Sequence, residues 1–309
     1  MLVVPKVGGE VRDKHFTDIL DYLAPGDVLV LNNTRVTALR LFGQKPTGAA
    51  VELLILRSTG TEGKFLALVK PGKRLRVGAR IELQEGLVAT IVGETEGGVR
   101  EVAFSPHPGL EVALERAGQV PLPPYITTRL SDPSRYQTVF AEVPGSSAAP
   151  TASLHFTPLM IEEIKSKGIQ IAPVTLDVGI DTFRPIESET AEAHKMHGEV
   201  CRIGEPSARI INERKGRLIA VGTTAVRTIE SFARAGQVQA GETNTKIFIT
   251  PGYRWQAVDG LLTNFHLPRT TMLMMVAAMI GRERLMGAYA HAIESRYRFL
   301  SFGDAMLII

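Results

Sequence analysis

The sequence feature that most constrains the fold is the continuous apolar run Val28–Leu31, which follows Asp27 and ends in Asn-Asn-Thr. A strand with apolar side chains on both faces has to be covered on both, which is typical of parallel sheets in α/β proteins. Beyond residue 150, similar strands alternate with helices, which predicts an α/β fold with a mostly parallel sheet flanked by helices. The strands expected there are 169–176, 217–221, 246–250, 260–264 and 305–309.

Helix end signals locate the helices between these strands. Thr157-Pro158 has the order of an N-cap residue and a first-turn proline, so a helix is expected to begin there. Thr223-Thr224 is expected to cap a second helix that runs to Gly236. Two more helices are predicted at 270–280 and 282–297.

Residues 40–121 have a different pattern, in which short β-branched runs are separated by Gly or Pro at regular intervals. This predicts a small antiparallel β-barrel, with a sandwich as the alternative, inserted into the other domain. The α/β domain is then discontinuous and consists of residues 1–39 and 122–309. Its segment 122–149 is rich in Pro, Ser and Tyr, and long irregular connections of this kind are usually functional.

Composition restricts the compartment and the possible cofactors. Cys201 is the only cysteine, which excludes an intrachain disulfide or a multi-cysteine metal site and suits a reducing cytosol. The most apolar run, Met272–Ile280, has nine residues, well short of the ~18 that span a bilayer. The N-terminus lacks the pattern of a signal peptide. A cytoplasmic protein without membrane contact is therefore expected.

The net charge of +3 and the pI of about 9.0 permit nucleic-acid binding without requiring it. One cluster of basic residues lies in the inserted domain and consists of Lys70, Lys73, Arg74 and Arg76. It is either a solvated turn or a contact to a nucleic-acid backbone.

Polar segments that follow strands are candidate binding sites, because ligands of open α/β sheets bind beyond the carboxyl ends of the strands. Four segments fit this description: 151–157, 177–185, 222–228 and 263–268. The candidate residues in them are Thr151, His155, Phe156, Asp177, Thr182, Phe183, Arg184, Thr223, Thr224, Arg227, Asn264 and His266.

Two readings remain open at the helix that follows residue 222. Thr223 and Thr224 either cap the helix or belong to a helix N-terminus that binds a carboxylate or phosphate. Arg227, one turn further along, either pairs with such an anion or reaches solvent.

The histidines also have alternative roles. His194 and His197 are three residues apart, which does not fit the metal-binding helix of zincins, so no metal site is expected with Glu199. An acid–base role and a structural hydrogen bond remain as alternatives, because histidine titrates near neutral pH. The same two alternatives apply to His266, which follows Asn264 closely.

Two nucleotide-binding motifs are absent. The first strand is not followed by G-x-G-x-x-G, which argues against a dinucleotide-binding domain and an ordinary methyltransferase glycine loop. G-x-x-x-x-G-K-[ST], the phosphate loop of ATPases, does not occur either.

Five long strings occur in the order of one known family: PGDVLVLNNTRV, YQTVFAEVPGSSAAPTASLHFT, VGTTAVRTIES, LLTNFHLPRTTMLM and HAIESRYRFLSFGDAMLI. They resemble the S-adenosylmethionine:tRNA ribosyltransferase-isomerases, and the resemblance extends along the whole chain. It implies transfer and isomerisation of the ribosyl part of S-adenosylmethionine onto 7-aminomethyl-7-deazaguanine in the tRNA anticodon. The product is epoxyqueuosine, and adenine and methionine are released.

The resemblance also implies partners and roles. S-adenosylmethionine is a consumed substrate, no cofactor or metal is needed, and the partner is tRNA with a GUN anticodon, bound by a monomer. The implied catalytic residues are His155, His194, His197, Glu199 and His266. The implied substrate-binding residues are Thr151, Phe156, Asp177, Thr182, Phe183, Arg184, Thr223, Thr224, Arg227 and Asn264. Lys70, Lys73, Arg74 and Arg76 are the implied tRNA contacts.

The sequence departs from the family pattern within the expected pocket. Asp177 and Asp181 stand where the family has His and Gly in a VTLHVGxGTFRP motif, and Gly198-Glu199-Val200 stands where HSEW or HSEY is usual. Family members also carry a further N-terminal stretch. The alternative expectation is therefore a divergent or truncated homologue that binds tRNA or a nucleoside without turnover.

Overall fold

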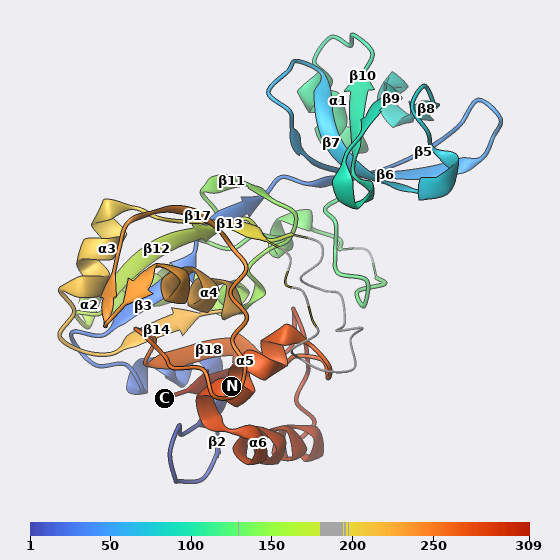
Figure 1. The fold of residues 1–309 in the computed structure, drawn as a ribbon. Helices are drawn as coiled ribbons and strands as arrows, with labels where there is room; N and C mark the ends of the chain where they lie inside the picture. Colours follow the sequence, from blue (N-terminus) through green and yellow to red (C-terminus); the bar gives the residue numbers. More distant parts are fainter. Residues whose placement is uncertain (129, 180–193, 195, 197) are drawn as a thin grey trace. The chain divides into compact units, whose positions relative to one another are not determined.

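The computed structural model describes residues 1–128, 130–179, 194, 196 and 198–309. The chain divides into two compact units, which are drawn as a ribbon in Figure 1. The α/β unit consists of Met1–Thr34, Gln137–Val143 and Ala149–Ile309, and the barrel unit consists of Arg35–Tyr136 and Pro144–Ala148.

The α/β unit is built on a nine-stranded sheet with the order β17-β13-β12-β3-β14-β18-β19-β1-β2. The strands, in this order, are Gly241–Thr245, Glu199–Ile203, Gln170–Leu176, Val28–Asn32, Leu218–Val221, Gly260–Asn264, Ala305–Ile308, Leu2–Val4 and Arg12–Asp13. The expected apolar run forms β3, which lies between β12 and β14 and is parallel to both.

Helices cover both faces of this sheet, as the apolar pattern of β3 requires. Val28 and Val30 face one core with α3 (Glu205–Asn212), α4 (Thr223–Phe232), α5 (Thr271–Ile280) and α6 (Arg282–Glu294). Leu29 and Leu31 face a second core with α2 (Pro158–Ser166) and the short helices η1 (Phe16–Asp21) and η6 (Thr151–His155). Each fully buried Val or Leu side chain stabilises the fold by about 1.5–3 kcal/mol.

The prediction of a mostly parallel sheet is wrong, because the sheet is mixed. The pairs β12–β3, β3–β14, β14–β18 and β1–β19 are parallel. The other four neighbouring pairs are antiparallel. The four central strands follow the predicted α/β pattern, whereas the direction of the outer strands depends on long-range pairing that residue periodicity does not encode.

Two local predictions were also wrong. No strand forms at 246–250; the strand in this region is β17, at Gly241–Thr245, which pairs with β13. Ile249 is apolar because it is buried in the core, without ladder hydrogen bonds. Helix α4 ends at Phe232, and its N-cap is Gly222, with φ 87°, rather than a threonine. The predicted cap at Thr157 is confirmed, since its side chain accepts a hydrogen bond from the Met160 amide.

The barrel unit contains the predicted antiparallel barrel, which is closed by six strands in the order β10-β7-β6-β5-β8-β9. In chain order, β5 to β10 are Leu39–Gln44, Ala50–Ser58, Lys64–Lys70, Arg80–Leu83, Val88–Glu94 and Arg100–Phe104, and α1 follows at Leu110–Ala117. Gly43 permits the closure, because a Cβ atom there would collide with the carbonyl oxygen of Glu82 on β8. Closure leaves the barrel without exposed sheet edges.

Among the described residues, no helix is long and apolar enough to cross a bilayer.

A buried carboxylate joins the starts of two central strands. Asp27, 1% exposed, accepts hydrogen bonds from the Arg217 amide at 2.7 Å and from Arg217 Nη2 at 2.6 Å, and from the Ala24 amide at 2.9 Å. Burial alone would raise the pKa of Asp27, but these hydrogen bonds outweigh burial and hold the pKa below its ordinary value of 3.8.

Replacing Asp27 by Asn is expected to lower the free energy of unfolding at pH 7 by about 1–3 kcal/mol, because buried donors lose a charged acceptor. Since the native pKa lies below the unfolded value, this stabilisation is present above about pH 4 and is lost as the pH falls. Urea unfolding at pH 7 and pH 3 measures the difference, with the exposed Asp21→Asn as control. An Asp27→Asn effect of equal size at both pH values would contradict this account.

Candidate active site

The carboxyl ends of the four central strands lie at one edge of the sheet, because β12, β3, β14 and β18 are mutually parallel. Three of the four polar segments predicted from the sequence lie at this edge: two begin directly after β12 and β14, and the third begins with the last two residues of β18. The fourth forms η6, which contacts the same edge: a Cβ atom at Gly222 would lie 3.5 Å from the Cβ of Ala152. The structure therefore brings described parts of all four segments to one edge.

His155 is held at this edge by a short polar chain. The Thr151 hydroxyl donates to Asn264 Oδ1 at 3.1 Å, which leaves the Nδ2 end of the amide toward His155 Nε2 at 3.4 Å. Because Nδ2 is a donor, Nε2 has to be the unprotonated nitrogen of the ring. The ring also stacks on Phe16, with 4.8 Å between centroids. Burial lowers the pKa of His155 to about 4, so the imidazole is neutral at pH 7.

His266 lies on the other side of β18. Its Nε2 is 2.7 Å from the Thr263 hydroxyl, and its backbone amide donates to the Tyr289 hydroxyl at 2.8 Å. Successive residues of a strand point to opposite faces of a sheet, so Thr263 and Asn264 direct His266 and His155 to opposite faces. Burial lowers the pKa of His266 to about 4 as well. The two histidines are therefore separate neutral groups rather than one pair.

A buried ion pair joins β13 to α4. Arg227 Nη1 donates to Glu199 Oε2, and both residues are less than 10% exposed. The second Glu199 oxygen accepts from the Gly179 amide at 2.9 Å, and Arg227 Nη2 donates to the Thr245 carbonyl at 3.4 Å. Burial lowers the pKa of Arg227 to about 10, which keeps the guanidinium charged at pH 7. The predicted catalytic Glu199 and the predicted anion-binding Arg227 thus contact each other.

Two buried hydroxyls, one on α4 and one on η6, have no hydrogen-bond partner among the described residues. They are Thr224 Oγ1 and Ser153 Oγ. A buried polar group without a partner costs free energy, so such groups often contact a ligand when it binds. Sequence reasoning did not single out Ser153, since nothing in the string TASLHF distinguishes a buried serine from a solvated one.

The other predicted site residues have diverse surroundings. Phe156 is buried in the second core, edge-to-face with Phe16 at 5.1 Å. Asp177 follows β12 and accepts a hydrogen bond from Arg202 Nη2 at 2.8 Å. His194 packs edge-to-face on Phe248 at 5.5 Å. Thr182, Phe183, Arg184 and His197 lie outside the described residues, as does Asp181. No group of three or more potential metal ligands occurs in the described part of the chain.

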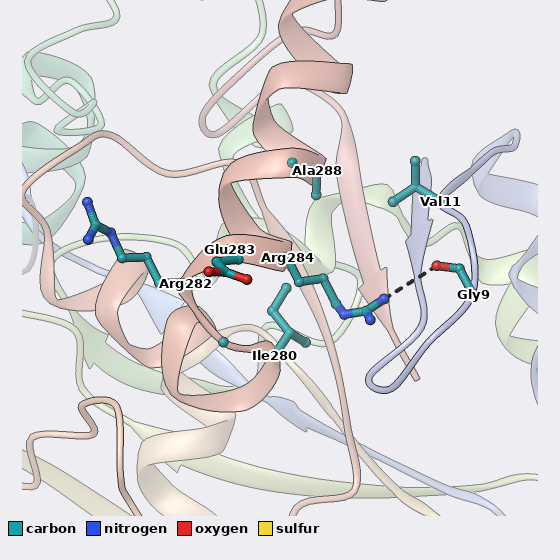
Figure 2. A pocket seen from close by; sticks show the side chains of 9 residues that line it. Gly9, Val11, Ile280, Arg282, Glu283, Arg284 and Ala288 are labelled. Atoms are coloured by element: carbon teal, nitrogen blue, oxygen red, sulfur yellow. Dashed lines mark hydrogen bonds between the residues drawn. The ribbon is translucent and has the colours of Figure 1, made fainter.

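A cavity of about 600 Å³ lies away from these residues, between the start of α6 and the loop after β1 (Figure 2). Arg284 Nη1 crosses to this loop and donates to the carbonyls of Gly8 and Gly9 at 2.7 and 3.4 Å. Strand β1 is antiparallel to β18, so its loop lies at the edge opposite the carboxyl end of β18. This cavity contains none of the predicted site residues.

The chain matches known proteins over its full length. The family model for the queuosine biosynthesis protein matches residues 1–308. The crystal structure of an S-adenosylmethionine tRNA ribosyltransferase from Thermotoga maritima is 35% identical in sequence, with a TM-score of 0.54. This match covers 100% of the present chain and 91% of that chain. The similarity therefore includes both units.

The buried ion pair predicts non-additive effects on stability. Glu199→Leu and Arg227→Met are each expected to lower the free energy of unfolding by about 3–5 kcal/mol, because each leaves a buried charge without its partner. The double variant should be destabilised less than either single variant. Arg202→Met removes partly exposed pairs with Asp177 and Glu242 and should cost under about 1 kcal/mol for each pair. Urea unfolding measures these free energies. If the losses of the two single variants add up in the double variant, the result would contradict the buried ion pair.

The surroundings of His155 predict its titration. Its ring resonances, assigned with His155→Gln, should titrate near pH 4 in NMR spectra of the folded protein. Because the native pKa lies below the ordinary 6.5, the unfolded state binds the proton first, so this group should lower stability as the pH falls from about 6.5 toward 4. Titration at or above pH 6.5 would show that the imidazole is solvated.

Proposed function

Because the chain belongs to the queuosine biosynthesis protein family, we propose that it is a tRNA-modifying transferase that uses S-adenosylmethionine as the ribosyl donor. The acceptor is 7-aminomethyl-7-deazaguanine in a GUN anticodon, and the product is epoxyqueuosine. The observation that carries this proposal is the family match over residues 1–308, supported by the full-length similarity to an S-adenosylmethionine tRNA ribosyltransferase. We further propose that the enzyme acts as a cytoplasmic monomer, consumes S-adenosylmethionine as a substrate and needs no cofactor.

The proposed reaction breaks three bonds of S-adenosylmethionine, one of which is the C4′–O4′ bond of the furanose ring. The ribosyl–adenine bond breaks and adenine leaves with a proton, while methionine leaves with the electron pair of the C5′–S bond, which makes its sulfur neutral. Three bonds form: the aminomethyl nitrogen loses a proton and bonds to C4′, a C1′–C5′ bond closes the cyclopentane, and the released ring oxygen bonds to C5′ in place of sulfur to form the epoxide. Because the sulfonium acidifies the adjacent 5′ carbon, the reaction begins with loss of a C5′ proton to a base.

His155 is the residue that we assign as this base. Its imidazole is neutral at pH 7, and Asn264 directs the unprotonated Nε2 to the edge where ligands of α/β sheets bind. The contact between Asn264 and Nε2 is long, at 3.4 Å, so a substrate proton can replace it. Glu199 is less suited because it already pairs with Arg227.

The start of α4 is the proposed site for the methionine carboxylate. Helix N-termini offer free N–H groups and a positive dipole to anions. The buried hydroxyls of Thr224 and Ser153 would gain a partner there, and Thr223 lies at the first position of the helix. Arg227, one turn further, adds a positive charge that Glu199 balances.

The assay is release of adenine and methionine from S-adenosylmethionine in the presence of tRNA that carries the aminomethyl base. His155→Gln is expected to lower kcat by about 10²–10⁴, which is the usual contribution of a general base. His291→Gln is the matched control, because His291 is on α6 and contacts Asp13 rather than the site.

Three outcomes would contradict the proposal. Retention of tRNA without adenine release by the unsubstituted protein would indicate a binding homologue without turnover. Formation of homocysteine would indicate a methyltransferase. Equal kcat for His155→Gln and His291→Gln would remove His155 from the base role.

A further inference from the structure

The basic excess of the chain lies in the barrel unit. Residues 35–136 and 144–148 contain 14 Lys and Arg against 10 Asp and Glu, whereas the whole chain contains 35 against 32. The remainder, which forms the α/β unit, therefore has 21 basic and 22 acidic residues. A polyanion is attracted to the unit with the positive excess, so the barrel unit is the part of the chain suited to bind one.

Buried Arg100 fixes one loop of this barrel. Its guanidinium donates to three backbone carbonyls: Leu75 at 3.3 Å, Gly98 at 3.1 Å and Gly72 at 3.5 Å. It also pairs with Glu94 at 2.7 Å, while Arg100 itself is only 7% exposed. Two of the three carbonyls belong to the segment between β7 and β8. Arg100 therefore holds that segment from inside the barrel.

One side chain of this segment is buried, and its neighbours on both sides are exposed. Leu75 is fully buried in the barrel core, and the flanking Arg74 and Arg76 are exposed. Lys70 and Lys73 are exposed as well. We call residues 70–76 the basic loop. The buried leucine and Arg100 together present its cations outward on a fixed backbone.

The cations of the basic loop have no acidic partner among the described residues, unlike two cations on the barrel strands. None of the four forms an ion pair with a residue that the structure describes, whereas Arg40 pairs with Glu52 at 3.0 Å and Lys64 with Glu101 at 3.4 Å. A fifth cation joins them, because Lys45, in the turn after β5, reaches the Arg74 carbonyl at 3.5 Å. The charge of the basic loop is therefore available to an external anion.

We propose that the basic loop and Lys45 bind the sugar–phosphate backbone of the RNA substrate, and that Arg100 is the positioning residue that presents them. The choice of RNA rests on the proposed function. A loop already fixed by Arg100 loses little conformational entropy on binding, so its cations contact phosphates at a low ordering cost. Such contacts carry affinity and orientation rather than sequence preference.

The first test compares two double variants with equal loss of charge. Arg74→Ala with Arg76→Ala should weaken binding of a tRNA transcript with a GUN anticodon. The slope of log Kd against log salt should fall by about 2, because each arginine that neutralises a phosphate contributes about 1 to the slope. The control, Arg57→Ala with Arg116→Ala, removes two exposed arginines elsewhere on the barrel and should retain the slope. Equal binding by the two double variants would overturn the proposal.

The second test isolates the positioning role. Arg100→Lys keeps the charge but cannot donate to three carbonyls at once, so the folded variant should bind the transcript several-fold more weakly with an unchanged salt slope. Thermal unfolding confirms that the compared protein is folded. If the folded Arg100→Lys variant binds the transcript with unchanged affinity, Arg100 is not a positioning residue. The basic-loop double variant would then still test whether the loop contacts RNA.

Turnover separates this inference from the proposed function. The basic-loop variants should raise KM for tRNA and leave kcat at saturating tRNA unchanged, since these residues do not touch the reacting atoms. If the unsubstituted protein releases no adenine, the proposed reaction fails, whereas the binding comparison still decides whether the basic loop contacts RNA. A lower kcat at saturating tRNA with unchanged KM would contradict a role in RNA binding.

Discussion

The apolar faces of β3 are the constraint on which the α/β unit depends. Val28 and Val30 pack into one core and Leu29 and Leu31 into the other, so helices have to cover both sides of the sheet. Because helices cover both faces of the central sheet, a ligand can approach its strands at their ends. The carboxyl ends of β12, β3, β14 and β18 meet at one edge, and the predicted polar segments gather there.

Burial also determines the chemistry of this edge. It keeps His155 neutral, and it requires the charge of Arg227 to be balanced by Glu199. A neutral imidazole and a balanced ion pair can both lie in a dry site without a large electrostatic cost. The buried hydroxyls of Thr224 and Ser153 have no hydrogen-bond partner among the described residues, and a polar ligand at the start of α4 would satisfy them.

Local patterns in the sequence predicted the elements better than their assembly. The strands β3, β12, β14 and β18 and the inserted barrel follow from apolar runs and turn spacing, because burial imposes those patterns directly. The mixed sheet was missed, because strand direction at its margins depends on pairing between distant segments. Polar residues after strands predicted which segments gather at one edge of the sheet, but they did not predict that Glu199 and Arg227 pair or that β18 separates His155 from His266.

Mass spectrometry of the nucleosides from modified tRNA tests the central claim most directly. S-adenosylmethionine labelled in its ribose carbons is incubated with the protein and tRNA that carries the aminomethyl base, and the RNA is then digested. We predict that all five ribose carbons appear on the wobble nucleoside as an epoxycyclopentane, and that a methyl label does not transfer. A methylated nucleoside, or an unmodified one after adenine has been released, would contradict the account.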